Sequence, residues 1–140
     1  MNATFDWRHS WDRFVDEVQT RLDAGSTGPD LASFFAGETI YWEGIIDNML
    51  LDEEAPGVGI LMPIRSITSS DRTQVQLTGV SVSVDSCNVP KWSRLSIGDA
   101  VGFTANFSGP RAVFPCCQLI PLPSGLTVFI IALEGAIPVS

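Results

Sequence analysis

The first part of the chain carries hydrophobic residues at the spacing of an amphipathic helix. Apolar side chains recur every three or four positions, at Trp7, Trp11, Phe14, Val15, Val18 and Leu22. This period places them in one stripe along a helix, with the charged residues on the opposite side. We expect Thr4 or Asp6 to cap the start of this helix and Gly25 to end it. A short second helix is predicted over residues 30–36, because Pro29 suits a first helical position and Gly37 stops the pattern.

From residue 38 onward the hydrophobic period changes to two, which is typical of β-strands. Strands are predicted at residues 38–51, 58–67, 73–84, 101–107, 111–120 and 126–139. In the second strand Val58, Ile60, Met62 and Ile64 share one face, and Pro63 marks an edge or a bulge. In the third strand the apolar phase shifts at Gly79, where a β-bulge would return every apolar side chain to one face. The last strand is apolar on both faces, so we expect it to be central or covered by the first helix.

Together these elements predict a mainly β protein, a small β-barrel of five to six strands with an N-terminal amphipathic α-helix. A chain of 140 residues fits one domain, with a helical segment at 1–37 and the barrel at 38–140. Hydrophobic residues make up 45% and charged residues 17% of the chain, which are globular values.

The cysteines and the absence of a targeting segment indicate a cytoplasmic protein. Cys87, Cys116 and Cys117 cannot all pair within the chain, and adjacent cysteines rarely bridge each other, so an odd count suits a reducing compartment. The first 21 residues hold no apolar signal-peptide core, and no apolar run approaches the ~20 residues that span a bilayer. We therefore expect no membrane association.

Negative charge is concentrated in the front of the chain. Residues 1–54 hold 12 acidic and 3 basic residues, for a net charge of −9, whereas residues 55–140 hold 4 acidic and 5 basic residues. Such a field repels phosphate and favours basic partners.

Three features of the predicted strands resemble the OB-fold, a five-stranded, partly open Greek-key barrel. The first strand holds a central glycine in Trp42-Glu43-Gly44-Ile45-Ile46, and the third is broken by Gly79. The run Leu95-Ser96-Ile97-Gly98-Asp99-Ala100-Val101-Gly102-Phe103 is similar to the entry to the fourth strand in many OB domains. The likeness covers residues 38–139. It departs from the OB pattern in a short, proline-broken connector before the fourth strand and in one strand too many at the end.

The OB resemblance implies binding of oligonucleotides or oligosaccharides on strands two and three, between the loops after strands one and four. Single-strand binding needs a basic groove and aromatic platforms. Strands two and three hold no aromatic residue, and the loop after strand one is Asp52-Glu53-Glu54, which repels a phosphate backbone. Nucleic-acid binding is therefore disfavoured. A ligand-binding alternative would use Trp92 and the basic residues Arg65, Arg72, Lys91, Arg94 and Arg111.

Catalytic and metal-binding patterns are weak in this sequence. His9 is alone on the polar side of the first helix, and no Gly-x-Ser-x-Gly, P-loop or His-Glu-x-x-His motif is present. Asp52-Glu53-Glu54 lacks the spacing of a calcium loop, and Cys116-Cys117 matches no zinc motif. We interpret the acids as a turn and the cysteines as core residues, and we predict no cofactor and no metal.

The remaining hypothesis is a non-enzymatic interaction domain, accessory or inhibitory, that binds a basic protein partner. The predicted contact residues are the exposed acids and one loop tryptophan: Asp12, Asp16, Glu17, Asp52, Glu53, Glu54 and Trp92. Self-association through the last strand or the tryptophan stripe stays open as an alternative. A small enzyme with a pocket of perturbed carboxylates is the third hypothesis.

Overall fold

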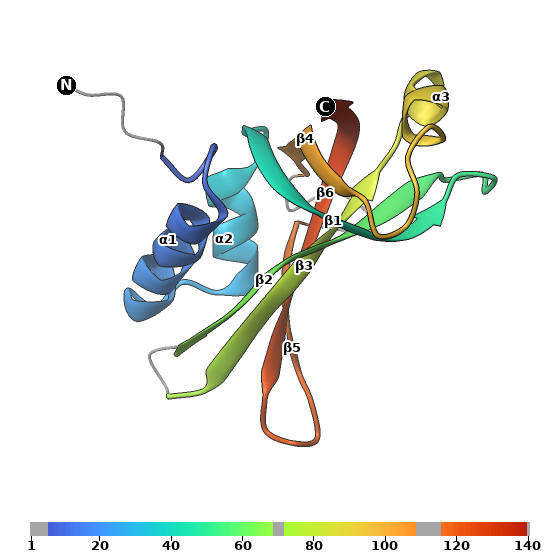
Figure 1. Cartoon of the computed structure of the whole chain (residues 1–140). Coiled ribbons are helices and arrows are strands. Elements are labelled where there is room, and N and C mark those ends of the chain that lie inside the picture. The colour runs from blue at the N-terminus through green and yellow to red at the C-terminus, as the bar shows by residue number, and fades with distance from the viewer. Residues whose placement is uncertain (1–5, 69–71, 109–115, 140) are drawn as a thin grey trace.

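The computed structural model describes residues 6–68, 72–108 and 116–139, and it shows a mainly β chain with helices at its N-terminal end (Figure 1). The helices are α1 (Trp11–Asp23), α2 (Gly28–Phe35) and the short α3 (Val89–Trp92), which follows a 3-10 turn at Ser86–Asn88. The strands are β1 (Thr39–Leu50), β2 (Gly57–Thr68), β3 (Gln74–Ser83), β4 (Ala100–Phe107), β5 (Cys117–Pro121) and β6 (Thr127–Val139).

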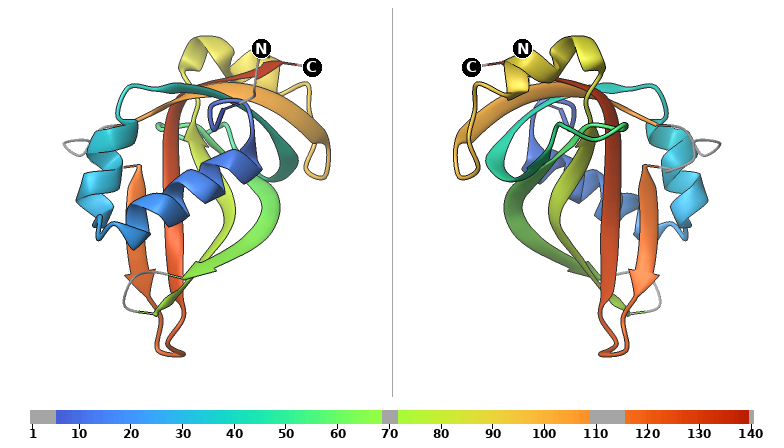
Figure 2. Two further views of the ribbon diagram at one scale, coloured as in Figure 1. Left: turned by 90° about the vertical axis from the view of Figure 1, so that its left-hand side faces the viewer. Right: turned by 90° about the vertical axis from the view of Figure 1, so that its right-hand side faces the viewer.

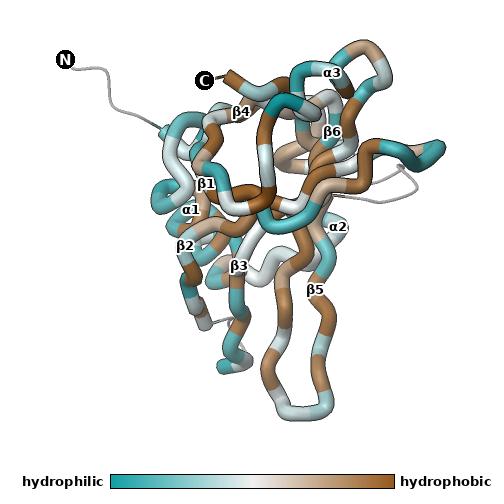
Figure 3. Tube along the Cα trace, turned by 45° about the vertical axis from the view of Figure 1, so that its right-hand side comes forward, coloured by the Kyte–Doolittle hydropathy of each residue, from teal (hydrophilic) through white to brown (hydrophobic). Residues whose placement is uncertain are grey.

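Five of these strands close into a ring. β1 pairs with β2, β2 with β3, β4 with β1 and β6 with β4, all antiparallel, and the ring closes because β3 also pairs with β6 in parallel. β5 pairs with β6 and forms a hairpin that projects beyond the ring, with hydrophobic residues along its arms and a more polar tip (Figure 3). This closed, barrel-like ring with its N-terminal helix confirms the predicted fold class.

α1 begins later than its hydrophobic stripe predicted. Its N-cap is Ser10, whose hydroxyl accepts a hydrogen bond from the backbone N–H of Arg13 at 3.3 Å. The prediction of a cap at Thr4 or Asp6 is therefore wrong: Trp7 lies in the turn before the helix, although its side chain is buried with the stripe. The helix ends at Asp23, and Gly25 follows with φ of 89°, as the predicted stop requires.

Both N-terminal helices pack their apolar sides against the interior of the barrel. Figure 2 shows α1 crossing the barrel between β2 and β5, with α2 beside it. The interface is an aromatic cluster in which the ring of Phe14 lies 4.8 Å from Trp42 and 5.7 Å from Phe107. The buried aromatic members of this cluster are Trp7, Trp11, Phe14, Phe35, Trp42, Phe107 and Phe129. The helices are thus part of the same hydrophobic core as the strands.

A bulge in β2 changes which residues face inward. Leu61 pairs with Gly79 and Arg65 with Leu77, so β2 contains two more residues than β3 between these rungs. The predicted phase shift at Gly79 is confirmed, because Leu77 before it and Val80 after it are both buried, and the extra residues opposite it belong to β2. A Cβ at Gly79 would lie only 2.5 Å from the carbonyl oxygen of Ile60. The prediction that Ile64 faces inward is wrong, because the extra residues rotate it outward, and 66% of its surface is exposed.

The connector between β3 and β4 is helical, although its sequence suggested an irregular loop. Trp92 is the last residue of α3, and the helical turn directs its indole onto β6, where the ring nitrogen donates to the carbonyl of Ala136 at 3.0 Å. The side chain is fully buried. The prediction of an exposed Trp92 that contacts a partner is therefore wrong, because burial and a hydrogen bond hold the side chain in the core.

Cys116 and Cys117 are buried at the start of β5 and are joined by a disulfide between adjacent residues. The expectation that adjacent cysteines stay unpaired is therefore wrong here, and Cys87 is the exposed free cysteine. The cytoplasmic location stays a prediction. Over the described residues, no helix has both the length and the apolar character needed to cross a membrane.

Candidate functional site

A groove of about 390 Å³ lies on the outside of the barrel. We call it the outer groove. It runs over the start of β2 and the end of β3, and it is bounded by the β1–β2 loop on one side and by β5 and β6 on the other. The residues that line it include Asn48, Leu50, Ala55, Pro56, Gly57, Gly59, Ser81, Ser83, Gln118 and Ile130.

The lining of the outer groove is uncharged. Its polar groups are hydroxyls and carboxamides, which can donate and accept hydrogen bonds. Leu50 and Ile130 add apolar walls, with 52% and 37% of their surfaces exposed. None of the residues lining it is aromatic, acidic or basic. The groove therefore suits a neutral chain with hydrogen-bonding groups, such as a polypeptide backbone.

Two glycines make the floor of the outer groove low. Gly57 and Gly59 alternate with the buried Val58 and Ile60, so they occupy the outward positions of β2. A Cβ at Gly59 would meet its nearest neighbour, the Cβ of Asn48, at 3.5 Å, which is ordinary contact. A side chain at this position could therefore be accommodated and would project into the groove.

The β1–β2 loop brings three acidic residues to one end of the groove. Asp52, Glu53 and Glu54 are exposed and directly precede Ala55 and Pro56, which line the groove. The acids of α1 lie elsewhere: Figure 1 shows α1 and the β1–β2 loop on opposite sides of the molecule. The predicted acidic contact residues thus form two separate groups.

The acids of α1 are engaged with arginines of the same chain. Asp12 contacts Arg65 at 2.6 Å, and Asp16 lies 3.8 Å from the same guanidinium. Glu17 pairs with Arg21 at 3.0 Å along the helix. These ion pairs reduce the charge that α1 offers to a partner, whereas no ion pair among the described residues involves the acids of the β1–β2 loop.

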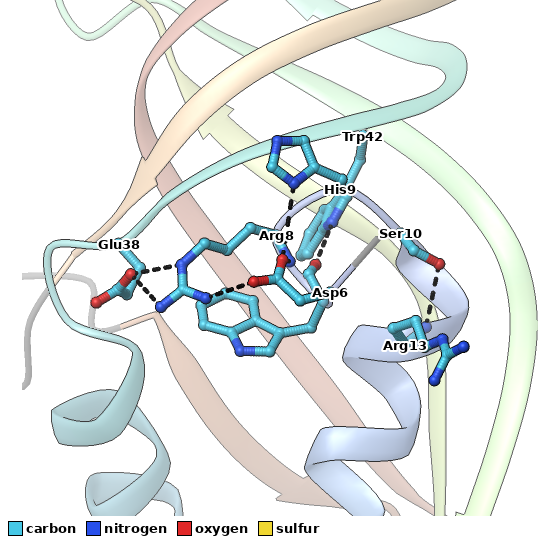
Figure 4. Close-up of polar contacts among 8 residues, drawn as sticks. Asp6, Arg8, His9, Ser10, Arg13, Glu38 and Trp42 are labelled. Atoms are coloured by element: carbon cyan, nitrogen blue, oxygen red, sulfur yellow. Dashed lines mark hydrogen bonds and ion pairs between the residues drawn. The ribbon is translucent and has the colours of Figure 1, made fainter. Parts of the chain in front are cut away.

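The segment before α1 is anchored to the barrel by polar contacts (Figure 4). The Arg8 guanidinium contacts Glu38 at 2.7 Å and Asp6 at 2.8 Å, and the indole of Trp42 donates to the carbonyl of Trp7 at 2.9 Å. The hydrogen bond to Glu38 raises the pKa of Arg8. Desolvation opposes ionisation of Asp6, but hydrogen bonds from the backbone and side chain of Arg8 prevail and lower its pKa. These contacts hold the segment before α1 in place against the barrel.

The basic residues of the alternative site are dispersed. Arg65 is paired with α1, Arg72 is exposed at the β2–β3 turn, and Lys91 and Arg94 are exposed in or just after α3. Arg111 lies outside the described residues. The structure does not bring the described members together into one cationic surface.

The sequence offered His9 and the acidic and cysteine clusters as candidates for metal or acid–base chemistry. No group of three or more His, Cys, Asp or Glu side chains among them is arranged to hold a metal ion. His9 is exposed on the turn before α1, with its ring nitrogen 3.7 Å from a carboxylate oxygen of Asp6. A second depression of about 220 Å³ beside His9 is lined by Ser10, Asp12, Tyr41 and Glu43, among others.

Comparison with known proteins finds structural likeness without sequence likeness. No family model matches the chain, and no curated protein matches it in sequence. One similar solved structure is that of a proposed nucleic acid-binding lipoprotein from Klebsiella pneumoniae, with 10% sequence identity and a TM-score of 0.45. The alignment covers 94% of this chain and 90% of that one.

Proposed function

We propose that this chain is an OB-like, non-enzymatic interaction domain that binds a basic segment of another protein in the outer groove. The order of the ring supports the OB assignment: β1, β2, β3, β4 and β6 take the places of the five strands of the Greek-key barrel, and β5 is an addition between the last two. The outer groove then lies where OB domains bind their ligands, between the loop after the first strand and the segment after the fourth.

One observation carries the choice of partner: the lining of the groove is uncharged, and at its end stand three acids that form no ion pair among the described residues. A polypeptide offers backbone hydrogen bonds to Asn48, Ser81 and Gln118, and its lysines or arginines would be attracted to Asp52, Glu53 and Glu54. A phosphate backbone would meet the same acids with repulsion and would find no aromatic ring on which a base could stack.

The direct test is fluorescence anisotropy with three labelled 12-residue probes. The probes are a peptide of alternating lysine and serine, a peptide of alternating glutamate and serine, and a single-stranded oligonucleotide. We expect the lysine peptide to bind, and we expect its affinity to fall as salt is added, because exposed charges are screened over about 10 Å at 0.1 M salt. Binding of the oligonucleotide at least as tight as that of the lysine peptide would overturn the proposal.

Matched variants locate the binding. The triple variant Asp52→Asn, Glu53→Gln, Glu54→Gln should bind the lysine peptide roughly five- to tenfold more weakly, because each exposed charge pair contributes a fraction of a kcal/mol. The variant Asp16→Asn, Glu17→Gln, Asp23→Asn makes the same change of net charge on α1 and should bind as the wild type does. Equal losses in both variants would show that net charge, and not the β1–β2 loop, attracts the peptide.

The groove itself is tested by Gly59→Val, which places a side chain in it. We expect at least a tenfold loss of binding, because the added methyl groups occupy the space of the ligand. Ser66→Val is the control, since Ser66 is an exposed residue of the same strand that does not line the groove.

A further inference from the structure

Another depression, on the same outer face as the outer groove, is almost entirely apolar. It measures about 520 Å³ and is lined by Glu43, Gly44, Ile45, Leu61, Met62 and Pro63. We call it the apolar depression. The side chains of Ile45 and Leu61 are 46% and 47% exposed, and Ile64 beyond them is 66% exposed. Large aliphatic side chains gathered in this way on an outer sheet surface are typical of a contact surface.

The apolar depression and the outer groove are neighbours on one face of β1 and β2. Ile45 pairs with Leu61 in the depression, and Asn48 pairs with Gly59 in the groove. The rung between them, Ile46 with Ile60, points into the core. Gly59 and Leu61 are two residues apart on one strand, which is about 7 Å. An extended chain of about six residues, roughly 20 Å long, therefore reaches from one depression into the other.

The charges around this face select the occupant. Glu43 lines the apolar depression, Asp47 is exposed one position beyond Ile46, and Asp52 to Glu54 stand at the far end of the groove. Among the described residues, no lysine, arginine or histidine lines either depression. A second copy of the chain that docked here face to face would bring these acids against one another. A basic partner would instead be attracted electrostatically by the same acids.

We infer that the apolar depression and the outer groove form one docking surface for an extended polypeptide segment in which large aliphatic residues stand next to lysines or arginines. This inference rests on the proposed function and specifies its ligand. The aliphatic side chains of the partner pack on Ile45 and Leu61, and its basic residues face Glu43 and the acids of the β1–β2 loop. The backbone of the partner then lies over the glycine floor at residues 57 and 59.

The test compares two labelled peptides of equal charge on the same protein. One alternates lysine and serine over twelve residues, and the other carries leucine in place of its two central serines. We expect the leucine peptide to bind the wild type about tenfold more tightly, because burying one aliphatic side chain is sufficient for such a gain. The double variant Ile45→Ser, Leu61→Ser should lose this gain and bind both peptides alike.

A matched control uses Ile120→Ser, Leu122→Ser, which changes two exposed apolar residues near the tip of the β5–β6 hairpin. This variant should keep the full gain from leucine, and thermal melts should show that both double variants fold. If leucine gives no gain, or if the gain survives in the Ile45, Leu61 variant while the lysine–serine peptide still responds to the loop acids, the inference fails and the proposed function stands. If neither peptide binds, both fail.

Discussion

The core beneath α1 and the outer face of β1, β2 and β3 are built from opposite kinds of residue. Seven aromatic side chains of the described chain gather beneath the N-terminal helices, in contacts such as that between Trp7 and Phe35 at 4.9 Å. The outer face presents glycine, serine, aliphatic and acidic residues, and no aromatic residue lines either of its depressions. The difference indicates that the aromatic core stabilises the fold. The outer face does not contribute to this packing and is available for contact with a partner.

The largest effect is expected in the aromatic core. Trp42→Ala should lower the free energy of unfolding by about 3–5 kcal/mol, because the indole is buried against Trp11 and Phe14 and its removal leaves a cavity. Urea denaturation followed by circular dichroism measures this loss. Trp42→Phe keeps most of the side-chain volume and replaces the alanine variant in this measurement if the alanine variant does not fold. A loss below 1 kcal/mol in the alanine variant would mean that the helices are not joined to the barrel through this cluster.

A smaller loss is expected where α1 is tied to the bulge in β2. The indole nitrogen of Trp11 donates to the carbonyl of Pro63 at 2.8 Å. Trp11→Phe removes this donor and leaves the carbonyl oxygen of Pro63 without its hydrogen bond. We therefore expect a free energy of unfolding lower by about 1–2 kcal/mol in the same denaturation experiment. An unchanged midpoint would show that water replaces the indole without cost.

The start of α2 should make stability depend on acid pH. Thr27 and Asp30 form a capping box in which the Asp30 carboxylate accepts from the backbone N–H of Thr27 at 2.9 Å. That hydrogen bond lowers the pKa of Asp30. The folded pKa lies below the unfolded one, so the stabilisation is complete above about pH 4 and is lost as the pH falls through the lower folded value. Thermal melts between pH 6 and pH 2.5 should show a smaller acid-induced drop in Asp30→Asn than in the wild type.

The sequence predicted what depends on periodicity and missed what depends on distant pairing. The stripe from Trp11 to Leu22 and the alternation in β1 and β4 were sufficient to predict the helix, the strands and their inward faces. The N-cap was missed because Thr4, Asp6 and Ser10 are all good caps, and only the fold selects one of them. Trp92 was misplaced because its charged neighbours suggested exposure, whereas a helical turn directs the ring inward.

The outer groove could be anticipated only in fragments. The alternation of Gly57 and Gly59 with buried residues, and of Ser81 and Ser83 with Val82, signals an outward face with small side chains. The groove itself depends on the parallel pairing of β3 with β6, which places Ser81 opposite Ala132. No local pattern reports a pairing between residues so far apart in the chain. The acidic loop was identified from the sequence, but its position at the end of a groove was not.

The smallest effect is expected on the outer face, where the comparison between the two regions is sharpest within a single strand. Ile64 and Ile67 both belong to β2, three residues apart, with 66% and 7% of their surfaces exposed. Ile67→Ala should cost about 2–5 kcal/mol of stability, as removal of a buried aliphatic side chain does. Ile64→Ala should change stability by no more than about 0.5 kcal/mol, because removal of an exposed side chain leaves no buried cavity. Urea denaturation of the two variants makes the comparison directly. If the two losses are equal, the bulge at residues 62–64 does not rotate Ile64 outward in solution, and the aliphatic surface beside the apolar depression is part of the core instead of a surface available to a partner.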